Sequence, residues 1–438
     1  MTAQSKLLRP KDIQKWMDLL IEHASFEVKP LQLTDSTSWL VIDGAIRHSS
    51  GLFFNVVGVS WDEDSGRSYS QPFIEQREVG SLGFLLLKKG SKNQLLVQAK
   101  IEPGNVGVVQ LAPTYQATAS NAACVHGGKQ PLYPANFYPR SKFLVFETLQ
   151  SEQGSRFLGK QNRNILSVAD SWFNAAETHR WFHVDELLEL LTHDNLVNTD
   201  ARSVLVCCPW EELVSRIPFS RHSTAFAKDL QKSYQSRSAA KLRKIEADLN
   251  LLRSEVHPIR IVDINRMSGW RLTDYGLEAQ GTRPFDVRQI QVTAKIREVP
   301  VWDQPIIDSK GSGYVDLVCG RRKGLLQFLF CMQREPGLHD YVELRPTFIQ
   351  EPGIAAIPKD DLALKTKGKI VVESWQSDEG GRFFHDTNRY RIIDAGEAYQ
   401  VGDGWYWLTL GEIKALVSKG SFFTNEARSV LSLLLLWL

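Results

Sequence analysis

Cysteine is scarce in this sequence, and there is almost no excess of charge of either sign. The 438 residues include five cysteines, an odd number, and none stands in a CxxC pair. This pattern argues against a disulfide framework or a cysteine-ligated zinc site, and it predicts small buried thiols in a reducing compartment. The formal net charge is only +2, without the basic excess typical of nucleic-acid-binding proteins. We therefore expect no nucleic-acid partner, and any anion site must be local.

Long apolar runs are missing too. No stretch approaches the roughly 18 apolar residues of a membrane-spanning helix, and residues 1–12 lack the apolar core of a signal peptide. The sequence thus predicts a cytoplasmic protein with no membrane partner. The apolar run at residues 430–438 begins with a match to Val204 and Leu205 earlier in the chain, so we expect a buried helix there.

The signatures of common cofactor and metal sites are also absent. No GxGxxG follows a predicted strand and no Walker sequence occurs, so neither a dinucleotide-binding fold nor a P-loop is indicated. His179 and His183 are four residues apart, but no third ligand accompanies them. We expect neither a cofactor nor a metal.

What the chain does contain is a long internal repeat. The tripeptide Glu-Pro-Gly occurs at residues 102–104 and again at 335–337, a shift of 233 residues. A shift of 226 aligns the segments QSEQG with QSDEG and DARSVL with EARSVL, which are residues 150–154, 376–380, 200–205 and 426–431. One unit of about two hundred residues is therefore written twice.

The repeat predicts two domains joined by a helix. We expect the first repeat, with an N-terminal helix, in residues 1–222, a helical linker in residues 223–255, and the second repeat in residues 256–438. The linker lacks glycine and proline, and its apolar residues recur at spacings of three and four, which is typical of a long amphipathic helix. Such a helix can pack on its own domains or pair across a dimer.

Each repeat opens with strand patterns and closes with helix patterns. The strands predicted in the first repeat lie within residues 39–59, 82–88, 94–100, 106–111 and 143–149. An amphipathic helix is predicted over residues 11–22, and Thr409 and Glu412 have the spacing of a capping box. Asp200 and Glu426 suit the first turn of the last helix in each repeat. The fold class expected is α+β.

The repeated motifs carry a family resemblance. The segments QAKIEPGN, VQLAPT, LQSEQGSRF, NRN and DARSVL resemble the NDP-hexose 2,3-dehydratases of deoxysugar biosynthesis, over nearly the whole chain. The resemblance implies a tandem duplication of a Nudix-like domain, a mixed sheet with flanking helices, in a homodimer. It also implies dTDP-4-keto-6-deoxyglucose as substrate, without a nicotinamide cofactor. The carboxylate-rich helix of Nudix hydrolases is absent, so metal-dependent diphosphate hydrolysis is the weaker enzymatic interpretation.

The implied reaction removes water across carbons 2 and 3 of the sugar and gives a dTDP-3,4-diketo-2,6-dideoxyhexose. It requires a base for the proton on carbon 3, a donor for the enolate oxygen and an acid for the departing hydroxyl. Glu102, Lys100 and His126 have suitable side chains, and which of them is the base stays open. Exposure to solvent without a role is the alternative for Glu102. It is also the alternative for three residues of a polar loop that resembles a lid: Asn121, His126 and Lys129.

Amide, hydroxyl and basic side chains near these positions are candidates for holding the substrate. Arginine forks match diphosphate oxygens, and amides can bond sugar hydroxyls or the thymine edge. The candidates are Asn105, Gln110, Thr114, Asn121, Lys129, Gln150, Ser151, Gln153, Arg156, Asn162 and Arg163. A structural role is the alternative for Arg156 and Arg163, because the second repeat duplicates both. Tyr115 and Trp61 can stack on thymine or pack in the core.

The two copies differ where the chemistry is expected. Under the 233-residue shift, Lys100 aligns with Gln333 and Asn105 with Leu338. We therefore expect catalysis in the first repeat, with the second either structural or a weaker site. The alternatives to a dehydratase are a non-catalytic nucleotide-sugar-binding protein and, less favoured, a nucleotide-diphosphate hydrolase.

Overall fold

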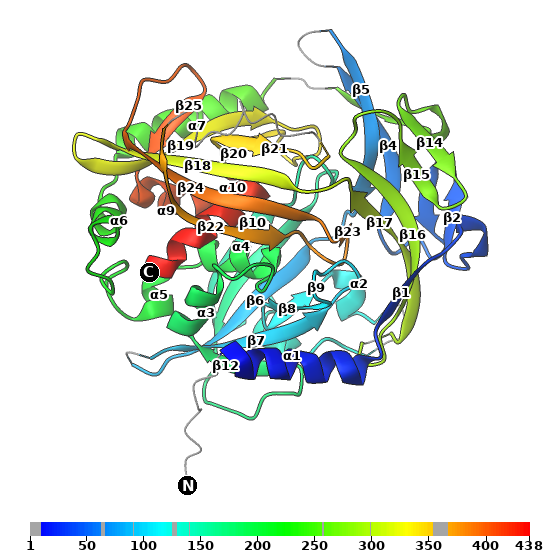
Figure 1. Ribbon diagram of the computed structural model, residues 1–438, viewed down its shortest axis with the longest axis horizontal. Helices are drawn as coiled ribbons and strands as arrows, with labels where there is room; N and C mark the ends of the chain where they lie inside the picture. Colours follow the sequence, from blue (N-terminus) through cyan, green and yellow to red (C-terminus); the bar gives the residue numbers. More distant parts are fainter. Residues whose placement is uncertain are drawn as a thin grey trace.

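The computed structural model describes residues 10–62, 66–90, 92–124, 129–139, 141–255, 258–297, 299–353 and 367–438. Within these residues the strands form two larger and two smaller sheets. Figure 1 places the smaller sheets together on one side of the molecule, while the larger sheets and most helices occupy the other. None of the described helices is long and apolar enough to span a membrane.

The two larger sheets have matching strands. The first contains β6 (Gly80–Leu87), β7 (Gln94–Ile101), β8 (Val109–Ala112), β9 (Tyr115–Ala117), β10 (Leu144–Ser151), β11 (Gln161–Val168) and β12 (His179–His183). The second contains β18 (Gly313–Arg322), β19 (Leu325–Arg334), β20 (Val342–Pro346), β21 (Phe348–Gln350), β22 (Lys369–Ser377), β24 (Thr387–Glu397) and β25 (Trp405–Leu408). Their orders, β10-β11-β6-β7-β12 and β22-β24-β18-β19-β25, correspond strand for strand. Both sheets are mixed, because β11 pairs with β6, and β24 with β18, in parallel.

Strand β6 shows why a nearly continuous apolar sequence forms the middle of such a sheet. Leu82, Phe84 and Leu86 point into the central core. Leu85 and Leu87 alternate with them and pack into a separate cluster on the opposite face. Both faces of the strand are therefore covered, as the absence of polar alternation in its sequence requires.

The smaller sheets exchange one strand each. The first contains β2 (Trp39–Ile42), β3 (Ala45–His48), β4 (Asn55–Asp62), β5 (Ser68–Glu75) and β13 (Ile259–Val262), and the second contains β14 (Trp270–Thr273), β15 (Gly276–Ala279), β16 (Phe285–Thr293), β17 (Val301–Ser309), β23 (Phe383–Phe384) and β1 (Glu27–Pro30). Strand β1 belongs to the first repeat but pairs with β16 of the second, while β13 belongs to the second repeat and pairs with β4 of the first. The division into residues 1–222 and 256–438 remains a prediction, and backbone pairing crosses it in both directions.

Two helices, one from each repeat, lie between the larger sheets. Outside the linker, the described helices are α1 (Pro10–Ala24), α2 (Ala119–Ala122), α3 (Val184–Leu190), α4 (Thr199–Cys207), α5 (Trp210–Val214), α9 (Leu410–Val417) and α10 (Asn425–Ser432). Helix α4 packs on the first sheet, α10 packs on the second, and the two helices pack on each other. The Thr199 hydroxyl donates to Asn425 Oδ1 over 3.1 Å at this contact. The two repeats therefore share one core.

The prediction of one long helix over residues 223–255 is wrong. Two helices occupy this segment, α6 (Ala225–Gln235) and α7 (Ala239–Arg253). Ser236 and Ser238 between them are extended, and Ser238 Oγ accepts a hydrogen bond from Lys241 N at 3.3 Å. Serine favours such caps over helix interiors because its side chain bonds the backbone. The break turns the chain without a glycine or proline.

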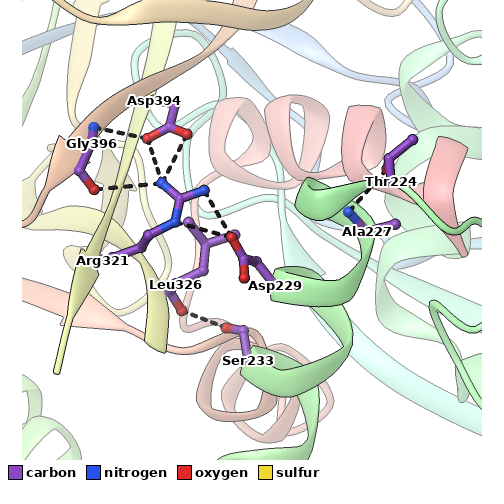
Figure 2. A network of polar contacts seen from close by, with 8 residues as sticks. All are labelled: Thr224, Ala227, Asp229, Ser233, Arg321, Leu326, Asp394 and Gly396. Carbon is purple, nitrogen blue, oxygen red and sulfur yellow. Dashed lines mark hydrogen bonds and ion pairs between the residues drawn. The ribbon is translucent and has the colours of Figure 1, made fainter. Parts of the chain in front are cut away.

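Both linker helices pack on their own chain. Leu230 of α6, and Ile245 and Leu249 of α7, are fully buried in the shared core. Figure 2 shows how α6 is fixed to the second large sheet: the Arg321 guanidinium bridges Asp229 of α6 and Asp394 of β24. The Ser233 hydroxyl donates to the carbonyl of Leu326 over 2.6 Å. The linker is thus an integral part of the fold.

Most other element predictions are confirmed. Helix α1 buries Ile13, Trp16 and Leu20 as its pattern indicates, but Leu19 is 44% exposed. Thr409 and Glu412 form the predicted capping box of α9. The C-terminal apolar run ends α10 and continues as a buried 3-10 turn, Leu433–Trp437.

The cysteine prediction holds for three of the five residues. Cys207, Cys208 and Cys319 are buried, whereas Cys124 and Cys331 are partly exposed. Cys124 follows the end of α2, and Cys331 lies in the half-buried C-terminal part of β19. The prediction that all five are buried is wrong for these two.

Candidate active site

A cavity of about 830 Å³ lies where the two repeats meet. Lys100, Glu102 and Asp200 of the first repeat line it, and so do Glu379, Gly381 and Arg382 of the second. Its volume falls within the range of about 300–1,000 Å³ typical of ligand pockets. The cavity is therefore a composite site to which both copies contribute charged groups.

The centre of the site is a buried acid–base pair. Lys100 Nζ lies 3.0 Å from Glu102 Oε1, and the two side chains are only 9% and 5% exposed. Glu102 Oε2 is buried and accepts no hydrogen bond from the described residues. Asn105 Nδ2 donates to the carbonyls of Lys100 and Val108, at 3.0 and 3.1 Å, and so closes the turn that carries Glu102. Glu102 is thus held in place beside Lys100, and one of its two oxygens has no hydrogen-bond partner among the described residues.

This turn docks on the other repeat. Gly104 N donates to Gly380 O over 2.8 Å. A Cβ atom at Gly104 would lie 1.6 Å from the carbonyl oxygen of Phe383, so only glycine fits. A Cβ at Gly381 would lie 3.3 Å from Glu102 Oε1 and 3.2 Å from Glu379 Oε1. The carboxylates of Glu102 and Glu379, one from each copy, therefore face the same point.

Further carboxyl groups surround the pair. Burial raises the pKa of Asp200 well above its ordinary value, and the charges of Glu379 and Glu152 raise it further. Burial also raises the pKa of Glu379, although Arg382 opposes the effect. The pKa of Glu152, which lies behind the cavity wall, rises to about 7 for the same reason. The raised pKa favours the protonated form of Asp200, which suits a group that acts as an acid.

Comparison with known proteins identifies the family. The sequence profile described as NDP-hexose 2,3-dehydratase matches residues 10–208 and 252–434. The chain belongs to the NDP-hexose 2,3-dehydratase family. Proteins named dTDP-4-dehydro-6-deoxy-alpha-D-glucopyranose 2,3-dehydratase resemble it throughout. That of Saccharopolyspora spinosa is 32% identical, covering 100% of this chain and 94% of the relative. That of Amycolatopsis orientalis is 30% identical (98% and 91% covered), and that of Streptomyces violaceoruber 33% (93% and 93%).

The site of this NDP-hexose 2,3-dehydratase family member contains part of the predicted set. The predicted residues that line the cavity are Lys100, Glu102, Thr114, Asn121, Lys129 and Asn162. His126 lies outside the described residues. Gln110 is buried behind the cavity, where its Nε2 donates to the carbonyl of Asn195 over 2.7 Å and to the Ser377 hydroxyl. Asn105 closes the turn, so both amides support the site from outside the cavity.

The QSEQGSRF segment, residues 150–157, does not line the cavity. Gln150 Nε2 donates to the carbonyl of Val417 over 2.8 Å, and the Ser151 hydroxyl donates to Glu343 Oε1 over 2.5 Å. Arg156 forms an ion pair with Glu351. Gln153 belongs to the same loop, whose Gly154 carbonyl accepts a hydrogen bond from Gly337 N over 2.9 Å. This segment therefore meets the Glu-Pro-Gly turn of the second copy.

Arg163 is also away from the cavity. Its Nε and Nη2 bind the two carboxylate oxygens of Glu147 at 2.6 and 2.7 Å across strands β10 and β11. This bidentate pair matches the structural alternative considered for this residue.

Sequence reasoning missed three groups of the site: Asp200, Glu379 and Arg382. Asp200 had an ordinary explanation as a first-turn residue of a helix, and the other two stand in the second repeat. Arg382 donates to the carbonyl of Gly381 over 2.8 Å and to Gln76 Oε1 over 3.4 Å, and it forms no ion pair with a described carboxylate. The sequence does contain the segment QSDEGGRF as the second copy of QSEQGSRF. The spacing of residues in the sequence, however, does not show that this segment docks beside Glu102 of the other repeat.

The remaining aromatic and metal candidates have structural roles. Tyr115 stacks on Phe137 at a centroid distance of 5.2 Å, and Trp61 stacks on Tyr69 at 5.9 Å. His179 Nε2 lies 3.0 Å from the carbonyl of Thr114, and burial lowers its pKa to about 4. No group of three candidate metal ligands occurs among the described residues.

Proposed function

We propose that this chain removes water across carbons 2 and 3 of dTDP-4-keto-6-deoxyglucose to give a dTDP-3,4-diketo-2,6-dideoxyhexose in deoxysugar biosynthesis. The relatives carry this activity in their names. The observation that supports it most directly is the buried Lys100–Glu102 pair, which opens on the same cavity as Asp200 and Glu379. An elimination next to a ketone needs a base, a cation and a protonated acid together.

The roles follow from the charges. Glu102 takes the proton from carbon 3, and the Lys100 ammonium stabilises the negative charge that develops on the carbon-4 oxygen. Asp200 in its protonated form transfers its proton to the hydroxyl on carbon 2, which leaves as water. The resulting enol becomes the 3,4-diketone by moving a proton from oxygen to carbon. No electrons are transferred to or from another molecule.

Arg382 is assigned to the diphosphate. Its guanidinium lies at the cavity with no carboxylate partner among the described residues, and its Nε is buried without a hydrogen bond. An arginine with free donors is suited to phosphate oxygens. Its counterpart Arg156 is already paired with Glu351.

We also infer that the two repeats are Nudix-like domains produced by tandem duplication, and that the protein works as a homodimer in the cytoplasm. The matching strand orders of the two larger sheets support the duplication. Light scattering after gel filtration tests the assembly, because a dimer has twice the chain mass of 49.6 kDa. A mass equal to one chain would contradict it.

The activity itself is tested by incubating the purified protein with dTDP-4-keto-6-deoxyglucose and no added cofactor. Mass spectrometry should detect a product lighter by one water, or its breakdown product. Bound but unchanged substrate would instead identify a binding protein, and release of dTMP would identify a hydrolase. Either of these outcomes would overturn the proposal.

A further inference from the structure

One end of the cavity has an aromatic wall, formed by Trp39, His48, Phe53, Phe54 and Trp302. Four of these rings are in contact: the centroid distances are 4.6 Å for Trp39–Phe54, 5.2 Å for Trp39–His48 and 4.4 Å for His48–Phe53. Trp302 lines the same cavity. Trp39 and Phe54 are buried, whereas His48, Phe53 and Trp302 are partly exposed. The wall thus has a buried layer that supports a layer open to the cavity.

The wall adjoins the groups assigned to the diphosphate and the sugar. The guanidinium carbon of Arg382 lies 4.2 Å from the centroid of the Phe54 ring. The next residue back, Gly381, faces the carboxylates of Glu102 and Glu379. The order is therefore aromatic wall, cation, catalytic carboxylates. A nucleoside diphosphate sugar has the same order: a flat base, two phosphates and the reacting sugar.

The second copy retains only the buried layer of this wall. Trp270 and Phe285 correspond to Trp39 and Phe54, and their centroids are 5.1 Å apart. The guanidinium carbon of Arg156 lies 4.4 Å from the centroid of the Phe285 ring, and that of Arg382 lies 4.2 Å from the centroid of the Phe54 ring. The packing arrangement of tryptophan, phenylalanine and arginine is therefore duplicated.

The open layer is not duplicated. Trp39 pairs with His48 across β2 and β3, and the equivalent pair across β14 and β15 is Trp270 with Ala279. Pro284 precedes Phe285 where Phe53 precedes Phe54. The Arg283 guanidinium covers Trp270 at 5.6 Å from its centroid. The second copy thus covers its tryptophan with an arginine, and among the described residues an aromatic open layer occurs only in the copy that carries Lys100 and Glu102.

We propose that the aromatic wall binds the pyrimidine base of a nucleoside diphosphate, which stacks on the open faces of His48, Phe53 and Trp302. The inference rests on the proposed function, since it takes the ligand to be a nucleotide sugar. Another ring that lines the cavity, that of Tyr115, is already stacked on Phe137. The neighbouring Thr114 hydroxyl accepts a hydrogen bond from Leu85 N over 2.9 Å.

The test compares His48→Ala and Phe53→Ala with wild type by calorimetry, using dTDP and, in competition, inorganic pyrophosphate. Each variant should weaken dTDP by roughly 5-fold to 100-fold, the range for loss of one base–aromatic stack. Pyrophosphate affinity should not change, because it has no base. His48→Ala introduces the residue that the second copy carries, so it is expected to fold. Tyr275→Ala, an exposed aromatic outside the cavity, is the control and should bind dTDP as wild type does.

Two outcomes would overturn the inference: wild-type affinity for dTDP in both variants, or an equal loss for dTDP and pyrophosphate. A failure of the proposed function can be distinguished from a failure of this inference. A wild type that binds dTDP through its base but dehydrates nothing would refute the dehydratase and still support the aromatic wall.

Discussion

Glu102 and Lys100 are spaced and buried in a way that serves chemistry better than stability. A buried ion pair loses its hydration, and well-packed apolar residues of similar volume are often as stable or more so. Glu102 in addition keeps a buried oxygen without a partner, which costs free energy in any folded protein. Such a cost at one residue is expected where the site performs a reaction.

Replacing Glu102 by Gln, or Lys100 by Met, should therefore lower kcat by about a hundredfold or more, as for a lost base or oxyanion donor. dTDP should still bind, because neither group is assigned to the nucleotide. The matched control is Glu335→Gln in the second copy, which should leave turnover nearly intact. If Glu335→Gln abolished dehydration and Glu102→Gln did not, the catalytic site would lie in the second copy, and its assignment to the first would be wrong.

Glu343 allows a test of stability against pH. It is fully buried, its Oε2 has no hydrogen bond from the described residues, and burial raises its pKa to about 7. The first copy has Gln110 at this position. Between the ordinary pKa and about pH 7 the folded state holds a proton that the unfolded state has lost, so this group's contribution to stability falls as pH rises.

The variant Glu343→Gln cannot titrate, so it should gain stability relative to wild type as pH rises. The gain should be up to about 3 kcal/mol, since each pKa unit corresponds to about 1.4 kcal/mol. Urea unfolding at about pH 5 and about pH 8 measures it. A constant difference between the two proteins would show that Glu343 is ionised in the folded state throughout.

Part of the site could be read from single residues, and part could not. Glu102 stood out because a Pro-Gly turn does not require a glutamate before it, and Lys100 lies on the same strand end. Asp200 and Glu379 could not be found in this way. An acidic residue is ordinary in the first turn of a helix, where Asp200 lies, and in a polar loop, where Glu379 lies. Only the packing of α4 and the docking of residues 376–381 bring the two carboxyl groups to the cavity.

The two Glu-Pro-Gly turns, as elements, join the repeats. Gly104 N donates to Gly380 O, and Gly337 N donates to Gly154 O, at 2.8 and 2.9 Å. Each turn therefore uses the loop of the other copy as its partner. Local turn chemistry explains why Pro-Gly follows a strand, but the requirement for glycine comes from this close approach.

Gly104→Ala should destabilise the protein by roughly 1–3 kcal/mol or more, the cost of overpacking a site that cannot yield, because the new methyl group meets the backbone oxygen of Phe383. Activity should fall with it, since Glu102 moves with the turn. Thermal unfolding and turnover are the measurements. Gly402→Ala is the control, because nothing lies within 4 Å of a Cβ there. Equal melting temperatures for both variants would contradict the docking.

The linker shows the limit of periodicity at the level of elements. Apolar spacings of three and four continue on both sides of residues 236–238, so the pattern alone does not reveal the break. Two serines suffice to end one helix and cap the next. The direction of α7 then follows from its burial against the second sheet, which is long-range information.

For the whole molecule, the exchanged strands make the two copies interdependent. Strands β1 and β13 each complete the smaller sheet of the other copy, and α4 and α10 share one core. The internal repeat predicted two similar units, and their matching strand orders agree with that. It could not predict the exchange, because alignment of a repeat with itself does not distinguish a strand paired within its copy from one paired across.

The second copy is less suited than the first to bind a nucleoside diphosphate. In the second copy Gln333 replaces Lys100, Asp386 replaces Lys160, and Leu338 lies where Asn105 closes the first turn. Burial and the charges of Glu426 and Glu351 raise the pKa of Glu335. Arg156 already forms an ion pair with Glu351. A diphosphate would therefore meet more carboxylates and fewer free cations there.

Calorimetry on the wild type should give one tight dTDP-sugar site per chain, any second site being much weaker. Arg382→Met should weaken dTDP roughly 10-fold to 100-fold, as for a charged hydrogen bond removed. Arg156→Met is the matched control: it removes the same packing over a phenylalanine ring and should reduce stability while dTDP affinity stays at the wild-type value. Two equal tight sites, or a loss of dTDP affinity in Arg156→Met rather than in Arg382→Met, would contradict this assignment. The ligand would then belong to the second Glu-Pro-Gly turn, and the catalytic roles would have to be reassigned with it.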